Sequence, residues 1–262
     1  MSKSKPGTMD RIAVARQALA CLDLTDLAEQ TTQEATIALC DRAVTPHGPT
    51  AAICIWPRFV ATARRHLGDL HPVRITTVVN FPSGDLPVGE VVDETRGAIA
   101  DGADEIDLVI PWKAFRSGDE GAVRIVVSAV REASPRFVLL KTILETGELG
   151  DPVLIETASR IALECGADFI KTSTGKVEVN ATLEAAEIML RAIAESGGHA
   201  GFKPAGGIRT VDDAAAYFAC AGRIMGRGWV SSRTFRFGAS GLLTDILATL
   251  GGDRAPQPGA GY

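Results

Sequence analysis

Two segments of this 262-residue sequence share one pattern: GADFIKTSTGK at residues 166–176 and GADEID at residues 102–107. In each segment Gly-Ala-Asp is followed by two residues and then by a charged residue, which is Lys171 in the first and Asp107 in the second. Desolvating an ammonium group is costly, and burial favours the neutral, nucleophilic amine. An acid and an amine at equivalent positions of a repeated strand unit are the groups that Schiff-base chemistry requires.

Short apolar runs alternate with helical segments along the chain. Eight strands are predicted, at 51–56, 74–80, 105–110, 137–145, 169–174, 201–205, 223–225 (the weakest) and 235–239. Helical periodicity fills the gaps, as at 88–100, 152–165 and 183–196, and Asp151 and Thr182 are typical helix starts. Eight strand–helix units in a chain of this length predict an α/β fold, the TIM (β/α)₈ barrel.

The barrel is expected to form one domain over residues 1–262, with a core at about 45–250. Residues 11–43 are predicted to add extra N-terminal helices, and the Gly- and Pro-rich segment 251–262 to form a mobile C-terminal tail. No apolar run approaches the roughly 18 residues that cross a bilayer. The first residues also lack the apolar stretch of a signal peptide, so a cytoplasmic location is predicted.

The composition excludes several classes of function. A net charge of −5 offers no basis for binding nucleic acid or a membrane surface. The five cysteines are scattered, which is typical of reduced thiols in a cytoplasmic protein. The four histidines have no ligand spacing, so we predict neither a metal nor another cofactor. No strand is followed by Gly-x-Gly-x-x-Gly, which disfavours a nicotinamide-dependent dehydrogenase.

Four charged residues fall at a regular interval within the predicted strands. Asp107, Lys141, Lys171 and Lys203 are 34, 30 and 32 residues apart. One βα unit of a barrel has about 30 residues, so we place them at corresponding positions of the third to sixth predicted strands. Alternate strands contribute to one layer of inward side chains, so Asp107 and Lys171 are expected to share a layer. A lysine can also snorkel outward between strand and helix, but four charged residues in register favour a functional cluster.

Lys203 is expected to favour the neutral form of Lys171. Neighbouring strands lie about 4.8 Å apart. Two ammonium groups about 4 Å apart repel by about 4 kcal/mol at an effective dielectric of about 20. Such repulsion is sufficient to make the neutral amine a large fraction of the protein at pH 7, without any metal.

Two glycine-rich turns follow the late strands. Gly206 and Gly207 precede a helix that starts near Thr210, and Gly238 and Ser240 precede the last helix. Glycine lets backbone N–H groups approach an anion closely, and helix N-termini favour negative charge. Because loops after late barrel strands commonly bind phosphate, the two turns predict a phosphate site after the sixth and eighth predicted strands.

The chain resembles the deoxyribose-phosphate aldolases, a family of metal-independent class I aldolases with a barrel fold. The resemblance extends from about Leu22 to Tyr262. It is carried by the segments LDLT (22–25), AAICI (51–55), NFP (80–82), EID (105–107), LLK (139–141), ETGEL (145–149), FIKTSTG (169–175), GFKPAGG (201–207) and RFGAS (236–240).

The resemblance implies an activity and four catalytic residues. The family cleaves 2-deoxy-D-ribose 5-phosphate reversibly to D-glyceraldehyde 3-phosphate and acetaldehyde, a step in deoxyribose phosphate and nucleoside catabolism. Lys171 would form the Schiff base, Lys203 would perturb it, and Asp107 would transfer protons through a bound water. Tyr262 matches a C-terminal tyrosine that helps to protonate the enamine.

The resemblance also implies residues that bind the substrate. These are Asp23, Thr25, Cys54, Lys141, Thr174, Lys176, Gly206, Gly207, Gly238 and Ser240. Within this set, Lys141 would pair with Asp107. Many relatives have a second serine where this chain has Gly241, so one hydroxyl contact to the phosphate is absent and tolerance of non-phosphorylated aldehydes is an open question.

Two alternatives remain open at this stage. Another Schiff-base barrel aldolase, acting on a different sugar phosphate, would have the same strand positions, and only substrate tests separate the two. A catalytically silent phosphate-binding barrel would not need Lys171, Lys203 and Asp107 together. The expected partner is a small-molecule sugar phosphate, with no nucleic acid and no membrane, and the expected assembly is a homodimer.

Overall fold

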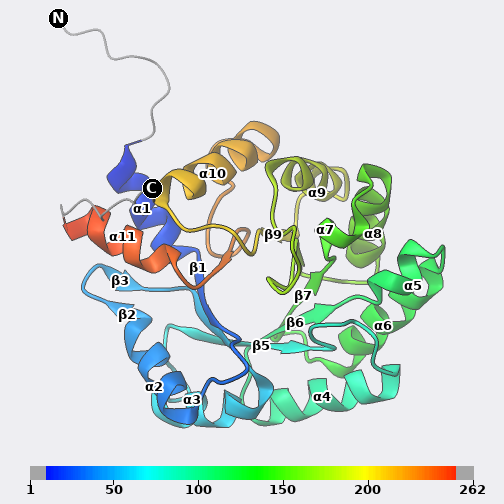
Figure 1. Ribbon diagram of the computed structural model, residues 1–262, viewed down its shortest axis with the longest axis horizontal. Helices are drawn as coiled ribbons and strands as arrows, with labels where there is room; N and C mark the ends of the chain where they lie inside the picture. The colour runs from blue at the N-terminus through cyan, green and yellow to red at the C-terminus, as the bar shows by residue number, and fades with distance from the viewer. Residues whose placement is uncertain (1–9, 252–262) are drawn as a thin grey trace, which may run out of the picture.

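The protein is a barrel of eight parallel strands surrounded by helices (Figure 1). The computed structural model describes residues 10–251. The barrel strands are β1 (Leu22–Asp26), β4 (Ala52–Ile55), β5 (Arg74–Val79), β6 (Glu105–Val109), β7 (Leu139–Ile143), β8 (Phe169–Lys171), β9 (Gly201–Lys203) and β10 (Phe237–Ala239). A small antiparallel hairpin, β2 (Val44–Thr45) and β3 (Gly48–Pro49), lies outside the barrel sheet.

The sheet closes between its first and last strands. Each strand pairs with the next in the order β10, β1, β4 to β9, and all these pairs are parallel. Two isolated parallel bridges, Phe202 with Phe235 and Ala205 with Gly238, join β9 to the β10 segment. The predicted TIM barrel is therefore confirmed.

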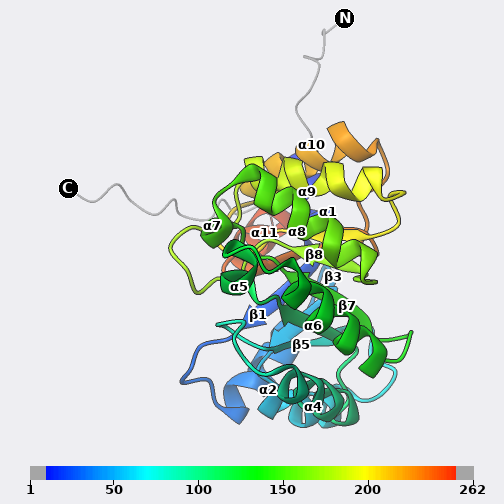
Figure 2. The ribbon, with the colours of Figure 1, turned by 90° about the vertical axis from the view of Figure 1, so that its right-hand side faces the viewer.

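Helices cover the outside of the barrel. They are α1 (Arg11–Ala20), α2 (Gln33–Arg42), α3 (Val60–Leu67), α4 (Val88–Ala100), α5 (Trp112–Arg116), α6 (Glu120–Ala133), α7 (Thr146–Leu149), α8 (Pro152–Glu164), α9 (Leu183–Glu195), α10 (Val211–Met225) and α11 (Leu242–Gly251), with a 3₁₀ turn at η1 (Pro57–Phe59). In Figure 2 the covering helices follow one another from α4 through α6, α8 and α9 to α10.

Local sequence signals explain where several of these helices begin. The predicted helices at 88–100, 152–165 and 183–196 correspond to α4, α8 and α9. The Asp151 side chain accepts a hydrogen bond from the backbone N–H of Val153, and Thr182 accepts one from Ala185, so both are N-caps as predicted.

Two of the predicted elements were wrong. Residues 223–225 are the last turn of α10 and form no strand, because Ile224 and Met225 are half-buried and pack against the core from that helix. The first barrel strand is instead β1, within the segment predicted to be helical. Its inward residue Asp23 interrupts the apolar pattern that identifies a strand. Only α1 is an extra N-terminal helix, since α2 follows β1 in the ordinary βα order.

This change moves the four charged residues by one strand, and they pair directly in two pairs. They lie on the fourth to seventh barrel strands, β6 to β9. Asp107 pairs with Lys141 across β6 and β7, and Lys171 pairs with Lys203 across β8 and β9. Between β7 and β8 the register is offset by two residues, because Lys171 pairs with Ile143 and Lys141 pairs with Phe169. The predicted correspondence therefore holds within each pair and not across all four strands, since a closed barrel staggers its strands.

Candidate active site

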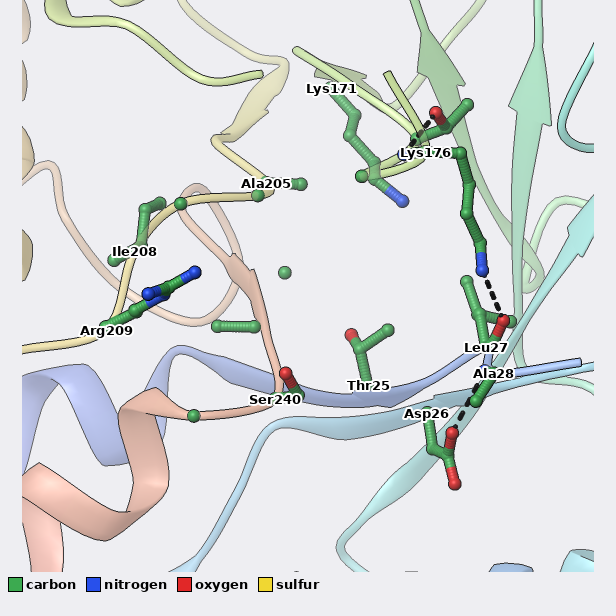
Figure 3. A pocket seen from close by; sticks show the side chains of 17 residues that line it. Thr25, Asp26, Leu27, Ala28, Lys171, Lys176, Ala205, Ile208, Arg209 and Ser240 are labelled. Carbon is green, nitrogen blue, oxygen red and sulfur yellow. Dashed lines mark hydrogen bonds between the residues drawn. The ribbon is translucent and has the colours of Figure 1, made fainter. Parts of the chain in front are cut away.

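A cavity of about 550 Å³ opens at the carboxyl ends of the strands (Figure 3). Its wall is formed by Lys171 and by four segments at or after the ends of strands, at 25–28, 174–176, 205–209 and 238–241. In Figure 3 the Lys171 side chain enters the cavity from one side and Arg209 from the other. Because barrel enzymes place their active sites at this face, this cavity is the candidate active site.

Lys171 lies at the floor of this cavity and is almost completely buried, with 2% of its surface exposed. It is the last residue of β8, and its Nζ donates a hydrogen bond of 2.8 Å to Oδ2 of Asp107. The same oxygen accepts a 2.8 Å hydrogen bond from Nζ of Lys203. One carboxylate oxygen therefore joins the two lysines that the sequence places on neighbouring strands.

A larger buried network lies beneath these three residues. Lys141 donates to Oδ1 of Asp107 at 2.8 Å and forms an ion pair of 2.7 Å with Glu105. Lys203 also donates to Asp23 at 2.5 Å. The three carboxylates are buried, as are Lys141 and Lys203, so each charge here depends on a partner.

The charges in the network stabilise one another. Burial alone would raise the pKa of Asp107, but the ammonium groups of Lys141, Lys171 and Lys203 outweigh it and hold that pKa well below its usual range. Burial alone would lower the pKa of Lys203, but the carboxylates of Asp107 and Asp23 raise it instead. Asp107 and Lys203 therefore keep their charges at neutral pH. The repulsion expected from the sequence counts only the two lysines, whereas the structure has a carboxylate between them.

The two glycine-rich turns form the opposite wall. Gly206 and Gly207 both have a φ of +83°, which glycine adopts without strain. The turn leads into α10, which Thr210 caps through a capping box with Asp213. Gly238 lies against Ala205, and the turn that contains Ser240 leads into α11. Since β9 and β10 are the seventh and eighth strands, the turns follow adjacent strands and face one cavity.

Lys176 and Thr174 belong to the loop after β8. Lys176 lies along the cavity wall, where its Nζ donates a 2.7 Å hydrogen bond to the backbone oxygen of Leu27 (Figure 3). Thr174 is held from below by the buried carboxylate of Glu145, which accepts from its N–H at 3.1 Å and from its hydroxyl at 2.5 Å.

The structure places the remaining predicted residues as follows. Thr25 lines the cavity, whereas Asp23 and Lys141 lie in the buried network beneath it. Cys54 is completely buried, and this burial raises the pKa of its thiol. Tyr262 lies outside the described residues.

Four residues of the cavity wall and of the buried contacts around it were missed at the sequence level. They are Glu105, Glu145, Arg209 and Arg236. Arg236 follows Lys203 by 33 residues and so continues the regular spacing of the charged positions. This spacing could have identified Arg236 from the sequence. Glu105 lies two residues before Asp107 on the same strand and therefore on the same face. Glu145 has a left-handed backbone (φ +56°), a conformation that the sequence does not indicate for a glutamate.

Comparison with known proteins supports this geometry. The profile of the DeoC/LacD family aldolases matches residues 17–232. A deoxyribose-phosphate aldolase from Agrobacterium fabrum (strain C58 / ATCC 33970) is 60% identical over 244 residues, which cover 93% of this chain and 94% of that protein.

The chain belongs to the DeoC/LacD family of aldolases. The aldolase is therefore a carbon–carbon lyase. Solved structures agree with this assignment. The apo form of a Toxoplasma gondii ME49 protein, provisionally named deoxyribose-phosphate aldolase, matches with a TM-score of 0.85 at 25% identity, over 92% of this chain and 97% of that one. The deoxyribose phosphate aldolase of Aeropyrum pernix, 22% identical over 93% of this chain and 98% of that one, has the same fold with a TM-score of 0.73.

Proposed function

We propose that the aldolase cleaves 2-deoxy-D-ribose 5-phosphate to D-glyceraldehyde 3-phosphate and acetaldehyde through a Schiff base on Lys171. The identity of 60% to the Agrobacterium fabrum enzyme supports this substrate. The observation that carries the proposed mechanism is the buried contact of 2.8 Å between Lys171 and Asp107 at the floor of the cavity. A buried amine at this position is the nucleophile that a class I aldolase needs.

The proposed reaction begins when the neutral amine of Lys171 attacks the aldehyde carbon of the open-chain substrate. Asp107 transfers protons through a bound water, and loss of water from the carbinolamine gives an iminium. Asp107, through the same water, then accepts the proton of the 3-hydroxyl. The C2–C3 bond breaks, its electron pair goes to the iminium to give an enamine, and C3 leaves as the aldehyde of D-glyceraldehyde 3-phosphate. Protonation of this enamine, followed by hydrolysis, releases acetaldehyde and restores Lys171.

The other residues of the site are proposed to bind the substrate phosphate and to keep Asp107 ionised. Lys203 and Lys141 keep Asp107 ionised and fix its orientation. The phosphate is proposed to bind between the turns at 206–207 and 238–240, where backbone N–H groups lie near the starts of α10 and α11. Lys176 would exchange its hydrogen bond with Leu27 for the phosphate. An exchange of this kind needs only rotation of a flexible side chain.

Several narrower expectations remain predictions. Tyr262 is expected to assist protonation of the enamine. The assembly is expected to be a homodimer, and the location cytoplasmic.

Among residues 10–251, no helix is long and apolar enough to cross a membrane. The described part of the chain also holds no cluster of three His, Cys, Asp or Glu side chains arranged as metal ligands. An added Cβ at Gly241 would meet no atom within 4 Å, so there is room for the hydroxyl that many relatives have.

The test is chemical trapping of the Schiff base. The protein is incubated with 2-deoxyribose 5-phosphate, reduced with borohydride and digested, and the modified peptide is identified by mass spectrometry. We expect the adduct on Lys171, and none in the variant Lys171→Met. Lys113→Met, which changes an exposed lysine, should be labelled as the wild type is. An adduct on Lys141 or Lys203 in the native protein, with Lys171 unmodified, would refute the assignment. Failure of this sugar to react while another sugar phosphate is cleaved would favour the alternative Schiff-base aldolase.

A further inference from the structure

The barrel interior beneath the cavity holds seven charged side chains in one connected network. The carboxylates are Asp23, Glu105 and Asp107, and the cations are Lys141, Lys171, Lys203 and Arg236. With every group in its usual ionised form, the network has one positive charge in excess. Lys171 is the only one of the seven that lines the cavity among the described residues. When its amine is neutral, the other six groups carry three charges of each sign.

Arg236 does not line the cavity, but it pairs with two of the three buried carboxylates and so balances their charge. Its Nη1 donates to Asp23 at 2.7 Å, its Nη2 donates to Glu105 at 2.8 Å, and its Nε donates to the backbone oxygen of Ser232 at 2.5 Å. Only 3% of its surface is exposed. Arg74 lies 3.7 Å from Glu105, but about half of its side chain is in water, which screens its charge.

Other titratable groups near the cavity lie outside this network. Asp26 lines the cavity and accepts hydrogen bonds from the backbone N–H of Ala28 at 3.1 Å and from the hydroxyl of Thr31 at 2.8 Å. Cys54 is a neutral thiol at neutral pH, because burial raises its pKa. Glu145 and Lys176, which follow β7 and β8, have opposite charges when both are ionised. Arg209 lies across the cavity and is exposed to solvent.

We propose that Arg236 is a positioning residue that compensates the buried carboxylates below Lys171, so that the proton on Lys171 is the one charge in excess. The inference rests on the proposed function, in which the neutral amine attacks the substrate. Without Arg236, the remaining five partners of Lys171 would carry one net negative charge, which would hold the proton on the amine. Without the charge of Glu105, the partners would carry one net positive charge, which would favour loss of the proton from Lys171.

Substitution of Arg236 and substitution of Glu105 are therefore expected to shift the pH dependence of Lys171 labelling in opposite directions. The rate at which acetaldehyde and cyanoborohydride label Lys171 should rise with pH as the amine loses its proton. Acetaldehyde does not titrate, so the curve reports on the protein alone. We expect the rising limb to move up by about one pH unit in Arg236→Met and down by about one pH unit in Glu105→Gln. The double variant should lie close to the wild type.

The matched control is Arg233→Met, which removes an exposed arginine three residues before Arg236. It should not shift the rising limb of the labelling curve. Damage to the fold alone would lower the rate at every pH without a shift, and so would contradict the inference. Equal shifts in one direction for Arg236→Met and Glu105→Gln would also contradict it. If Arg236→Met fails to fold, Glu105→Gln and the double variant still decide the question. Absence of labelling at Lys171 in the wild type would instead refute the proposed function.

Discussion

Among the individual side chains, Asp107 is surrounded by ammonium groups. Its two oxygens accept hydrogen bonds from three ammonium groups, those of Lys141, Lys171 and Lys203, each at 2.8 Å. A buried carboxylate with so many partners keeps its charge and orientation. The arrangement explains how two buried lysines can lie on adjacent strands. Their mutual repulsion is opposed by the carboxylate between them, so neither lysine can be considered without Asp107.

The first prediction concerns the charge of Lys203. Lys203→Leu should move the rising limb of the activity–pH curve to higher pH by about one unit or more, because the carboxylates of Asp23 and Asp107 would then hold the proton on Lys171. The Schiff base should still form slowly at high pH. Steady-state rates from about pH 6 to 10, with circular dichroism as a check of folding, measure the effect. Lys113→Leu, an exposed site, is the control. An unchanged pH profile in Lys203→Leu would mean that the two ammonium groups do not interact.

A second prediction concerns Glu145, whose backbone has the left-handed conformation and whose carboxylate holds Thr174. Such conformations persist where the surroundings enforce them, often at functional sites. Glu145→Gln places an NH₂ group where one oxygen now accepts a hydrogen bond, so the loop that carries Lys176 should be held less firmly. We expect about a tenfold loss in kcat/KM for the phosphorylated substrate.

The same measurement on Glu148→Gln provides the control, since Glu148 lies three residues further on and pairs only at the surface with Arg116. Free deoxyribose, which lacks the phosphate, should be affected less by Glu145→Gln than the phosphorylated sugar. Identical losses for both sugars would mean that Glu145 does not act through the loop.

Among the helices and strands, the sequence predicted those with a strong local pattern. The helices α4, α8 and α9 have apolar periodicity and were predicted to within one residue, and α8 and α9 also have clear starts at Asp151 and Thr182. The strand β1 was missed because its buried Asp23 breaks the apolar run, and this aspartate is buried only because Arg236 and Lys203 reach it from distant parts of the chain. Partners from distant parts of the chain also limit prediction of the site. The spacing of four charged residues placed the cluster, but the partners of Asp23 and Glu105 depend on tertiary structure.

The turn between β9 and α10 gives a third prediction. Gly207 has a φ of +83° and open space where a side chain would lie. Gly207→Asp should raise KM for the phosphorylated substrate by about tenfold or more, because the carboxylate would repel the phosphate at a helix N-terminus. KM for free deoxyribose should change little. Gly207→Asn, with the same size and backbone demand but no charge, should have a much smaller effect. Equal effects of Gly207→Asp on both sugars would place the phosphate elsewhere.

For the barrel as a whole, closure depends on the seam between β9 and β10. Elsewhere the strands pair through continuous ladders, whereas this seam has two isolated bridges within the described chain. Aromatic rings pack along it: Phe235 lies 5.7 Å from Phe202, 5.2 Å from Phe218 and 4.9 Å from Phe237, measured between ring centroids. Edge-to-face packing of this kind stabilises beyond simple burial. The seam also carries Lys203 and Arg236, so its packing supports the buried charges.

The last prediction follows from this packing. Phe235 is completely buried, so Phe235→Ala should lower the free energy of unfolding by about 3–5 kcal/mol, measured by urea denaturation. Phe137→Ala removes the same ring from a site where 78% of the residue is exposed and should cost less than about 0.5 kcal/mol. Because Phe235 precedes Arg236 and bridges to the residue before Lys203, the variant should also lose activity at temperatures where it remains folded. Equal stability of the two variants would mean that the rings do not hold the seam, and full activity in Phe235→Ala would mean that the charged network is positioned independently of it.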